Sequence, residues 1–203
     1  MTTFHLLATA SVLGLLSFFE PCTIATHTLF SVRVHGAAQA QRRRELISLW
    51  LARCSLSMGL LLSAVAITTP PGWGRVLPGV ALMLMASLYL VSRAVYIPVP
   101  HLEFWRLLPG AVDLPQAMKL GLTLPACTLP LFIILAALSI TLDSSADAAV
   151  AGLLFATVFT LPTALTAYLG LSEAGRRFLH AAALITAYLT AALLYGTAAY
   201  LLY

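Results

Sequence analysis

Charged residues are scarce in this chain: Asp, Glu, Lys and Arg make up 9% of its 203 residues, while 61% are hydrophobic. A soluble domain typically has about 25% charged residues and about 45–50% apolar ones. The shortage of charge excludes an ordinary soluble domain, and most of the chain is expected to lie in lipid. The apolar runs also lack strict alternation, which favours membrane helices over a β-barrel, whose strands read as alternating segments of about ten residues.

Other absences narrow the class further. The first seven residues contain no Lys or Arg, and no cleavage site of small residues ends the first apolar run, so we interpret that run as a transmembrane helix and not as a signal peptide. Three cysteines are too few for a disulfide scaffold. There is no Ser-His-Asp set, phosphate-binding loop, haem-attachment motif or pair of catalytic carboxylates. The net charge of +4 comes from basic residues in particular loops and does not indicate nucleic-acid binding.

Six apolar segments are each long enough to cross a bilayer, which takes about 20 residues. They cover residues 4–32, 46–68, 76–97, 114–142, 146–171 and 178–202. The sequence therefore predicts an all-α integral membrane protein with one transmembrane domain over residues 1–203 and six transmembrane helices.

The basic residues predict how these helices are oriented. Lys and Arg accumulate in cytoplasmic loops. In this chain they fall in the first, third and fifth connections, the third of which starts at about residue 92, or just inside the segment that follows: Arg33, Arg42, Arg43, Arg44, Arg93, Arg106, Lys119, Arg176 and Arg177. The second connection has only Arg75, and the fourth has no basic residue. We expect a multi-pass protein of the inner (plasma) membrane with both termini on the extracytoplasmic side.

Three helices in each half would leave the halves antiparallel in the membrane. We predict two inverted three-helix repeats, about 1–98 and 114–203, joined by a cytoplasmic loop at about 92–113. In such repeats the site lies near the membrane midplane, at the interface of the repeats. A Cys-Thr pair with a proline close upstream occurs in the leading segment of both halves.

These two cysteines are the candidate reactive residues. Cys22 lies near the middle of the first segment and Cys127 near the middle of the fourth, at the similar depth that a disulfide pair would need. A disulfide requires Cα atoms within about 7 Å, so the two helices would have to touch there. Pro21, Pro125 and Pro130 open the helical backbone beside them. Hydroxyl groups nearby add polarity: Thr23, Thr26, Thr123 and Thr128. The alternative is that each cysteine is a small packing residue beside a chance kink.

Pro-Cys at 21–22 in helix one and Cys-x-x-Pro at 127–130 in helix four resemble the CcdA family, the short relatives of the membrane core of the disulfide reductase DsbD. The topology resembles that family over essentially the whole chain, and the motifs over these two stretches. The family usually has both cysteines in a Pro-Cys-x-x-Pro setting. Here Ala25 replaces the downstream proline of the first motif, and Pro125 is displaced by one position from the second cysteine.

The resemblance implies a redox function. Cytoplasmic thioredoxin would reduce a Cys22–Cys127 disulfide, and the reduced pair would then reduce an extracytoplasmic thioredoxin-like protein or apocytochrome c, often in support of cytochrome c maturation. Such a thiol–disulfide oxidoreductase-like electron carrier needs no bound cofactor. The inverted repeats would expose the cysteine pair to each side in turn.

Glu20 is an ionisable residue within an apolar segment, which is a functional hypothesis by default. Two residues before Cys22, it would take a proton from an attacking thiol or hydrate the cavity around the cysteine. If the helix breaks at Pro21, it would instead face water in the break.

Three further residues invite weaker interpretations. We expect Arg53 to snorkel to the cytoplasmic surface and Cys54 to be structural. His27 lies five residues after Cys22, so the two do not share a helix face well. A metal site of Cys22, Cys127 and His27 would lack a clear fourth ligand, and we predict none.

Pro70, Pro71 and Pro162 are possible hinges. Arg42, Arg43 and Arg44 are typical of a topology signal, and they are also suited to anionic lipid or to an acidic soluble partner. The rival hypothesis for the whole chain is a small six-helix transporter of a metal or solute, in which the cysteines would be ligands or packing residues. Dependence of activity on both cysteines as a pair would distinguish the two functions.

Overall fold

The computed structural model describes residues 3–67, 79–80, 82–84, 86–87, 91, 102–109, 113–125, 127–142 and 144–202. Almost all of the elements among these residues are helices. They are α1 (Thr3–Phe19), α2 (Pro21–His35), α3 (Gln39–Ile67), α5 (Gln116–Gly121), α6 (Leu129–Leu142), α7 (Ser145–Leu169) and α8 (Glu173–Leu202), with the 3-10 helix η1 (Phe104–Leu107) and the short strands β1 (Leu102–Glu103) and β2 (Thr123–Leu124).

Several of these helices are long and apolar enough to cross a membrane. Gln39–Ala66, Ser145–Leu169 and Glu173–Tyr200 meet that criterion singly, and the bent pair Thr3–Phe19 and Cys22–His35 meets it together. The architecture is therefore compatible with an all-α membrane protein. Six spans and an inverted repeat remain predictions, because most of the expected third segment, with Pro70 and Pro71 before it, lies outside the described residues.

The first predicted segment is two helices and not one. α1 and α2 meet at an angle of 77°. Glu20 between them has extended backbone dihedrals, φ −65° and ψ 138°, and Pro21 begins α2. Proline suits the first position of a helix, because its fixed φ matches the helix and its missing N–H would have had no partner there.

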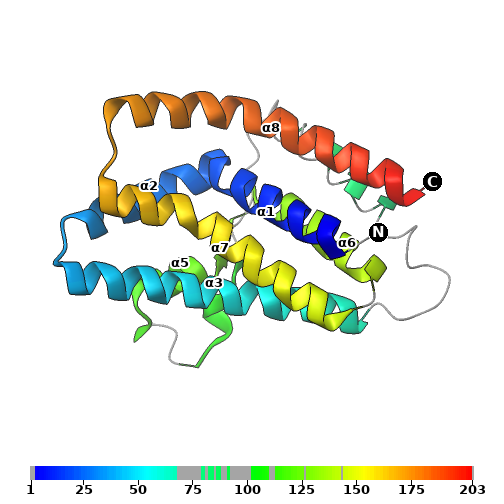
Figure 1. The fold of residues 1–203 in the computed structure, drawn as a ribbon, viewed down its shortest axis with the longest axis horizontal. Helices are drawn as coiled ribbons and strands as arrows, with labels where there is room; N and C mark the ends of the chain where they lie inside the picture. The colour runs from blue at the N-terminus through cyan, green and yellow to red at the C-terminus, as the bar shows by residue number, and fades with distance from the viewer. Residues whose placement is uncertain are drawn as a thin grey trace.

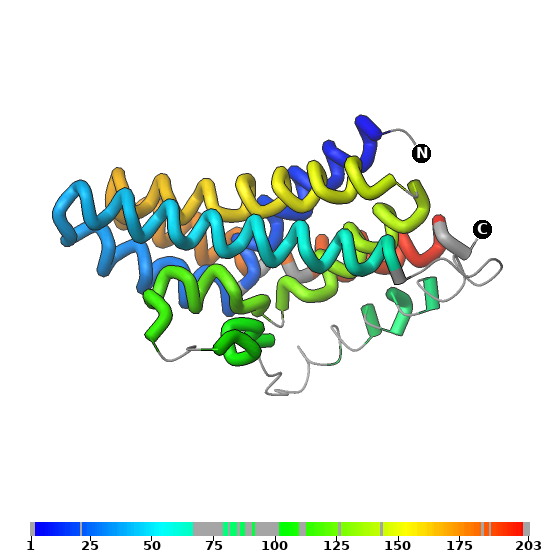
Figure 2. The backbone as a smooth tube through the Cα atoms, turned by 90° about the horizontal axis from the view of Figure 1, so that it is seen from below, coloured from blue at the N-terminus to red at the C-terminus, as the bar shows by residue number. Residues whose placement is uncertain are grey.

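The prediction of a continuous helix over residues 114–142 is wrong. α5 ends at Gly121, and Thr123–Leu124 pairs in antiparallel fashion with Leu102–Glu103 before α6 begins. Pro125 explains part of this break, since a proline disfavours helical dihedrals in the residue before it. Figure 2 shows α5 lying beside α3, which it contacts.

The long helices also extend past their predicted starts. α3 begins at Gln39 and not at 46, so the three consecutive arginines lie on its first turns. Its 29 residues span about 44 Å, more than the roughly 30 Å of hydrocarbon, so the added turns fit the polar interface. α7 is capped at Ser144, whose side chain accepts from the Asp147 amide, and the residue after its last turn, Gly170, has a positive φ of 77°.

α7 is the central helix of the bundle and contacts α1, α2 and α3 (Figure 1). Two glycines allow close packing there. A Cβ added to Gly14 of α1 would lie 2.6 Å from the Phe155 carbonyl oxygen, and one added to Gly152 would lie 3.0 Å from the Met58 amide nitrogen of α3. Buried Leu, Ile and Phe side chains of α1, α6 and α7 form the main core around this contact.

The ends of the bundle differ in character. The starts of α1 and α7 and the end of α8 lie at one end (Figure 1). The Thr3 hydroxyl of α1 contacts the Asp147 carboxylate of α7 there. The α2–α3 and α7–α8 turns lie at the other end (Figure 1). Arg33, Arg42 and Arg176 belong to that second end.

Candidate functional site

The structure brings Cys22 and Cys127 together in a disulfide. Their Cα atoms are 6.6 Å apart, although the residues are 105 positions apart in sequence. Both side chains are partly exposed, in contrast to Cys54, which is a free and buried thiol.

The break between α1 and α2 positions Cys22. Pro21 is the first residue of α2, so Cys22 lies in its first turn. That turn carries amide groups without partners inside the helix and the positive end of the helix dipole, which stabilise negative charge. The break therefore places one sulfur at the helix end that is electrostatically suited to a thiolate.

A different local structure positions Cys127. It follows β2 and Pro125, in a turn that leads into α6. The Thr128 amide and hydroxyl both donate to the Pro125 carbonyl, at 3.0 and 2.9 Å. Pro130 lies in the first turn of α6, where proline is tolerated. Pro125, Thr128 and Pro130 thus shape the turn that presents this sulfur.

Glu20 lies at the break but does not face water. Its side chain is fully buried and accepts a hydrogen bond from the Thr190 hydroxyl of α8 at 2.7 Å. The interpretation of a carboxylate exposed at the break is therefore wrong. Two buried hydroxyls on either side of it, Ser17 and Thr23, have no hydrogen-bond partner among the described residues.

A second polar cluster lies in the bundle, and the sequence analysis missed it. Arg53 is 3% exposed and lies at the midpoint of α3, so it does not snorkel to the surface as expected. It donates to His27 of α2 at 3.0 Å and to the Thr160 hydroxyl of α7 at 3.1 Å. His27 also contacts the Thr163 hydroxyl at 2.8 Å.

The helix around Pro162 contributes most of the acceptors in this cluster. α7 continues through Pro162, which lies between Thr160 and Thr163. The Ser31 hydroxyl donates to the Thr163 carbonyl at 3.1 Å. Arg53 itself could have indicated this cluster from the sequence. It is an ionisable residue within an apolar run, and such residues are functional candidates by default, as Glu20 is.

The residues named for a metal site do not assemble one. Cys22 and Cys127 are bonded to each other, and both ring nitrogens of His27 are engaged by Arg53 and Thr163. Within the part of the chain that the structure describes, no three His, Cys, Asp or Glu side chains are grouped as metal ligands.

No protein-family model, curated protein or solved structure matches the chain. The likeness to the CcdA family therefore depends on the two cysteine motifs and the helical pattern alone.

Proposed function

We propose that this protein carries reducing equivalents across the inner membrane by thiol–disulfide exchange at Cys22 and Cys127. The donor is cytoplasmic thioredoxin, and the acceptor is an extracytoplasmic thioredoxin-like protein or apocytochrome c in cytochrome c maturation. The observation that carries the proposal is the bond between two partly exposed cysteines, each placed beside a break in a helix.

The exchange proceeds in balanced steps. A donor thiolate attacks one sulfur of the disulfide, a mixed disulfide forms, and the other cysteine leaves as a thiolate. The second donor thiol then resolves the mixed disulfide, so the donor is oxidised and the pair gains two electrons and two protons. The same steps with an oxidised outer partner restore the Cys22–Cys127 bond.

Glu20 is the proposed proton-exchanging group. It is two residues from Cys22 and buried, and its contact with Thr190 fixes one carboxylate oxygen. A carboxylate so placed accepts the proton of an incoming thiol and returns it to the leaving sulfur.

We further propose that both termini are extracytoplasmic and that the halves are inverted repeats. The arginine-bearing turns lie at one end of the bundle, and the first and last described residues lie at the other (Figure 1). This arrangement supports the proposed orientation. The occurrence of a break in both cysteine-bearing segments supports a relation between the halves. Cysteine-substituted loops, labelled with a membrane-impermeant reagent in intact cells, test both points.

The decisive experiment is thiol alkylation of the purified protein with peptide mapping. We expect Cys22 and Cys127 to resist the reagent until reduced thioredoxin is added, and then to react together. Cys54→Ser is the matched control and should leave that pattern unchanged. Free Cys22 and Cys127 thiols that no oxidised thioredoxin can pair would rule out the carrier.

The rival function is a small metal or solute transporter. The buried polar residues at the middle of α3 and α7 favour it, because such residues inside membrane helices often line solute pathways. Substrate movement that survives either Cys22→Ser or Cys127→Ser would support the transporter over the electron carrier.

A further inference from the structure

The charge of Arg53 has no counter-ion among the described residues. The ion pairs found there involve Arg33, Arg106 and Arg176, all partly exposed. Arg53 instead contacts neutral groups: an imidazole, a hydroxyl and the face of the Phe159 ring, whose centroid lies 4.0 Å from the guanidinium carbon. Its side chain is 3% exposed, so the surrounding helices hold the guanidinium away from water.

The imidazole beside it is uncharged. A guanidinium can only donate, so Nε2 of His27 accepts from Arg53, and the ring hydrogen lies on Nδ1, which donates to the Thr163 hydroxyl. The cluster of Arg53, His27, Thr160 and Thr163 therefore carries one net positive charge in the interior of the bundle. An uncompensated charge of this kind is costly, which favours a bound partner of opposite sign.

We propose that this cluster is a binding site for a small planar monovalent oxyanion, the class that includes formate, nitrate and bicarbonate. One negative charge balances the site. The guanidinium has five N–H donors in a planar fork that matches two oxygens of such an anion, and acceptors for two of them are present among the described residues. The aromatic walls of Phe18 and Phe159, which flank His27, favour a small planar ligand over a bulky one.

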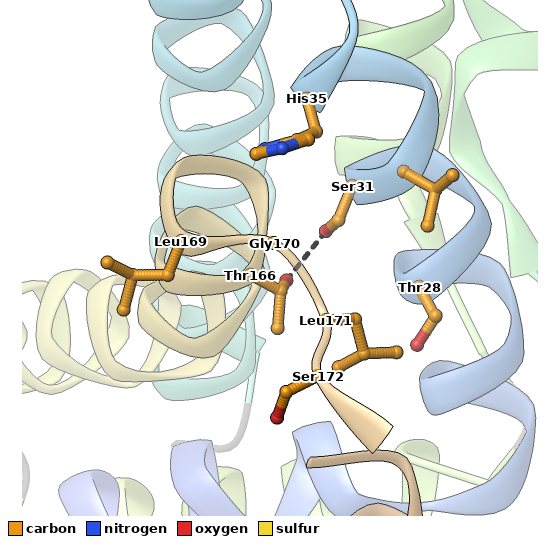
Figure 3. A pocket seen from close by; sticks show the side chains of 9 residues that line it. Thr28, Ser31, His35, Thr166, Leu169, Gly170, Leu171 and Ser172 are labelled. Atoms are coloured by element: carbon orange, nitrogen blue, oxygen red, sulfur yellow. Dashed lines mark hydrogen bonds between the residues drawn. The ribbon is translucent and has the colours of Figure 1, made fainter. Parts of the chain in front are cut away.

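A cavity with both polar and apolar walls lies at the arginine-bearing end of the bundle, and one of its lining residues, Ser31, is bonded to Thr163 of the cluster. It has a volume of about 490 Å³ and lies between α2 and the end of α7 (Figure 3). Thr28, Ser31, His35 and Thr166 supply its polar wall. The Thr28 hydroxyl oxygen is buried with no partner in the described structure, so it is available to a ligand or water.

Ser31 links this cavity to the cluster. Thr166 donates to the Ser31 hydroxyl at 2.9 Å, the bond drawn in Figure 3. Ser31 in turn donates to the carbonyl of Thr163, whose hydroxyl contacts His27. Since His27, Ser31 and His35 are four residues apart along α2, they share one face of that helix.

The first test is thermal unfolding of the detergent-purified protein, with the bulky anion morpholinoethanesulfonate replaced by formate or nitrate at constant ionic strength. We expect a saturable rise in Tm of about 5–10 °C at a hundredfold excess over Kd. Arg53→Gln should abolish the saturable part, and Arg53→Lys should keep it with at least a tenfold higher Kd. Arg33→Gln, the matched control at a partly exposed arginine, should behave as the wild type does.

A Tm that shows no saturable dependence on either anion, or the same dependence in Arg53→Gln, would overturn the proposal. If Arg53→Gln does not fold, nuclear magnetic resonance of the wild type with carbon-13 formate gives a second test. We expect magnetisation transfer from bound formate to an arginine guanidinium, and excess nitrate should remove this signal. The Arg33→Gln variant should still show it. Absence of that signal counts equally against the site. The double variant Cys22→Ser, Cys127→Ser should give the same anion titration as the wild type, because the cluster does not involve the cysteines. Failure to detect anion binding would therefore not bear on the redox proposal.

Discussion

The disulfide and the Arg53 cluster both connect α2 to other helices of the bundle, but they do so through different kinds of contact. The disulfide joins α2 to the start of α6 through one covalent bond, and both cysteines lie where the helical backbone is interrupted. The Arg53 cluster joins α2 to α3 and α7 through side chains of continuous helices, by hydrogen bonds and by contacts with the Phe159 ring.

This difference matters for function. A sulfur that must meet another protein needs an accessible backbone break, and both cysteines are partly exposed. A charge that must be held away from water needs intact helices around it, and Arg53 and His27 are almost wholly buried. We propose exchange chemistry for the first region and binding for the second, and variants should separate the two.

The largest effect is expected from the cysteines themselves. Cys22→Ser or Cys127→Ser should each abolish thioredoxin-driven reduction of an acceptor enclosed in proteoliposomes, because exchange needs two sulfurs. Arg53→Gln should retain that transfer. Thiol release in the lumen, measured with a chromogenic disulfide, gives the rate. Transfer that persists in either serine variant would contradict the division of roles, and Cys54→Ser controls for loss of a thiol that is not part of the pair.

Glu20→Gln should slow the same transfer by about 100-fold, the lower range for loss of a general acid–base group. The amide oxygen of glutamine still accepts from Thr190, so the contact and the fold are retained. Stopped-flow reduction by thioredoxin measures the rate. Glu45→Gln is the control at a carboxylate in the arginine-bearing end of the bundle. An unchanged rate in Glu20→Gln would leave the carboxylate with only a structural role.

Arg53→Met should lower the free energy of unfolding by about 1–3 kcal/mol, because the buried Nε2 of His27 loses its donor. Replacing both partners, as Arg53→Met with His27→Phe, should recover part of the loss, with a coupling energy of about 0.5–3 kcal/mol. Denaturant unfolding in detergent, followed by circular dichroism, measures each corner of the cycle. Strictly additive effects would show that the two side chains do not act as a unit.

The smallest effect is expected from Thr160→Val, which removes one neutral acceptor of Arg53 and should cost about 1 kcal/mol. Thr157→Val removes a more exposed acceptor on the same helix, that of the Trp50 indole, and should cost less. The same unfolding assay compares them. A larger loss in Thr157→Val would reverse the proposed ranking of the two contacts.

Part of the site follows from the sequence because it depends on local chemistry. Pro21 predicted the break beside Cys22, since proline acts on its own backbone and on the residue before it. The similar depth of Cys22 and Cys127 follows from counting residues in apolar runs. The break before Cys127 was only partly predictable, because the pairing of Thr123–Leu124 with Leu102–Glu103 joins segments that no local pattern connects.

The sequence by itself determined that the chain forms apolar helices, where the basic turns fall, and which cysteines lie beside prolines, because composition, charge and backbone restriction are properties of single residues and their neighbours. Only the tertiary structure decided that Arg53 points inward to His27 and Thr160, and that Glu20 is buried against Thr190. An arginine in an apolar helix has two ways to satisfy its charge, toward the interface or toward polar groups on other helices. The choice depends on which residues, far away in sequence, the packing of α2, α3 and α7 brings within hydrogen-bond distance.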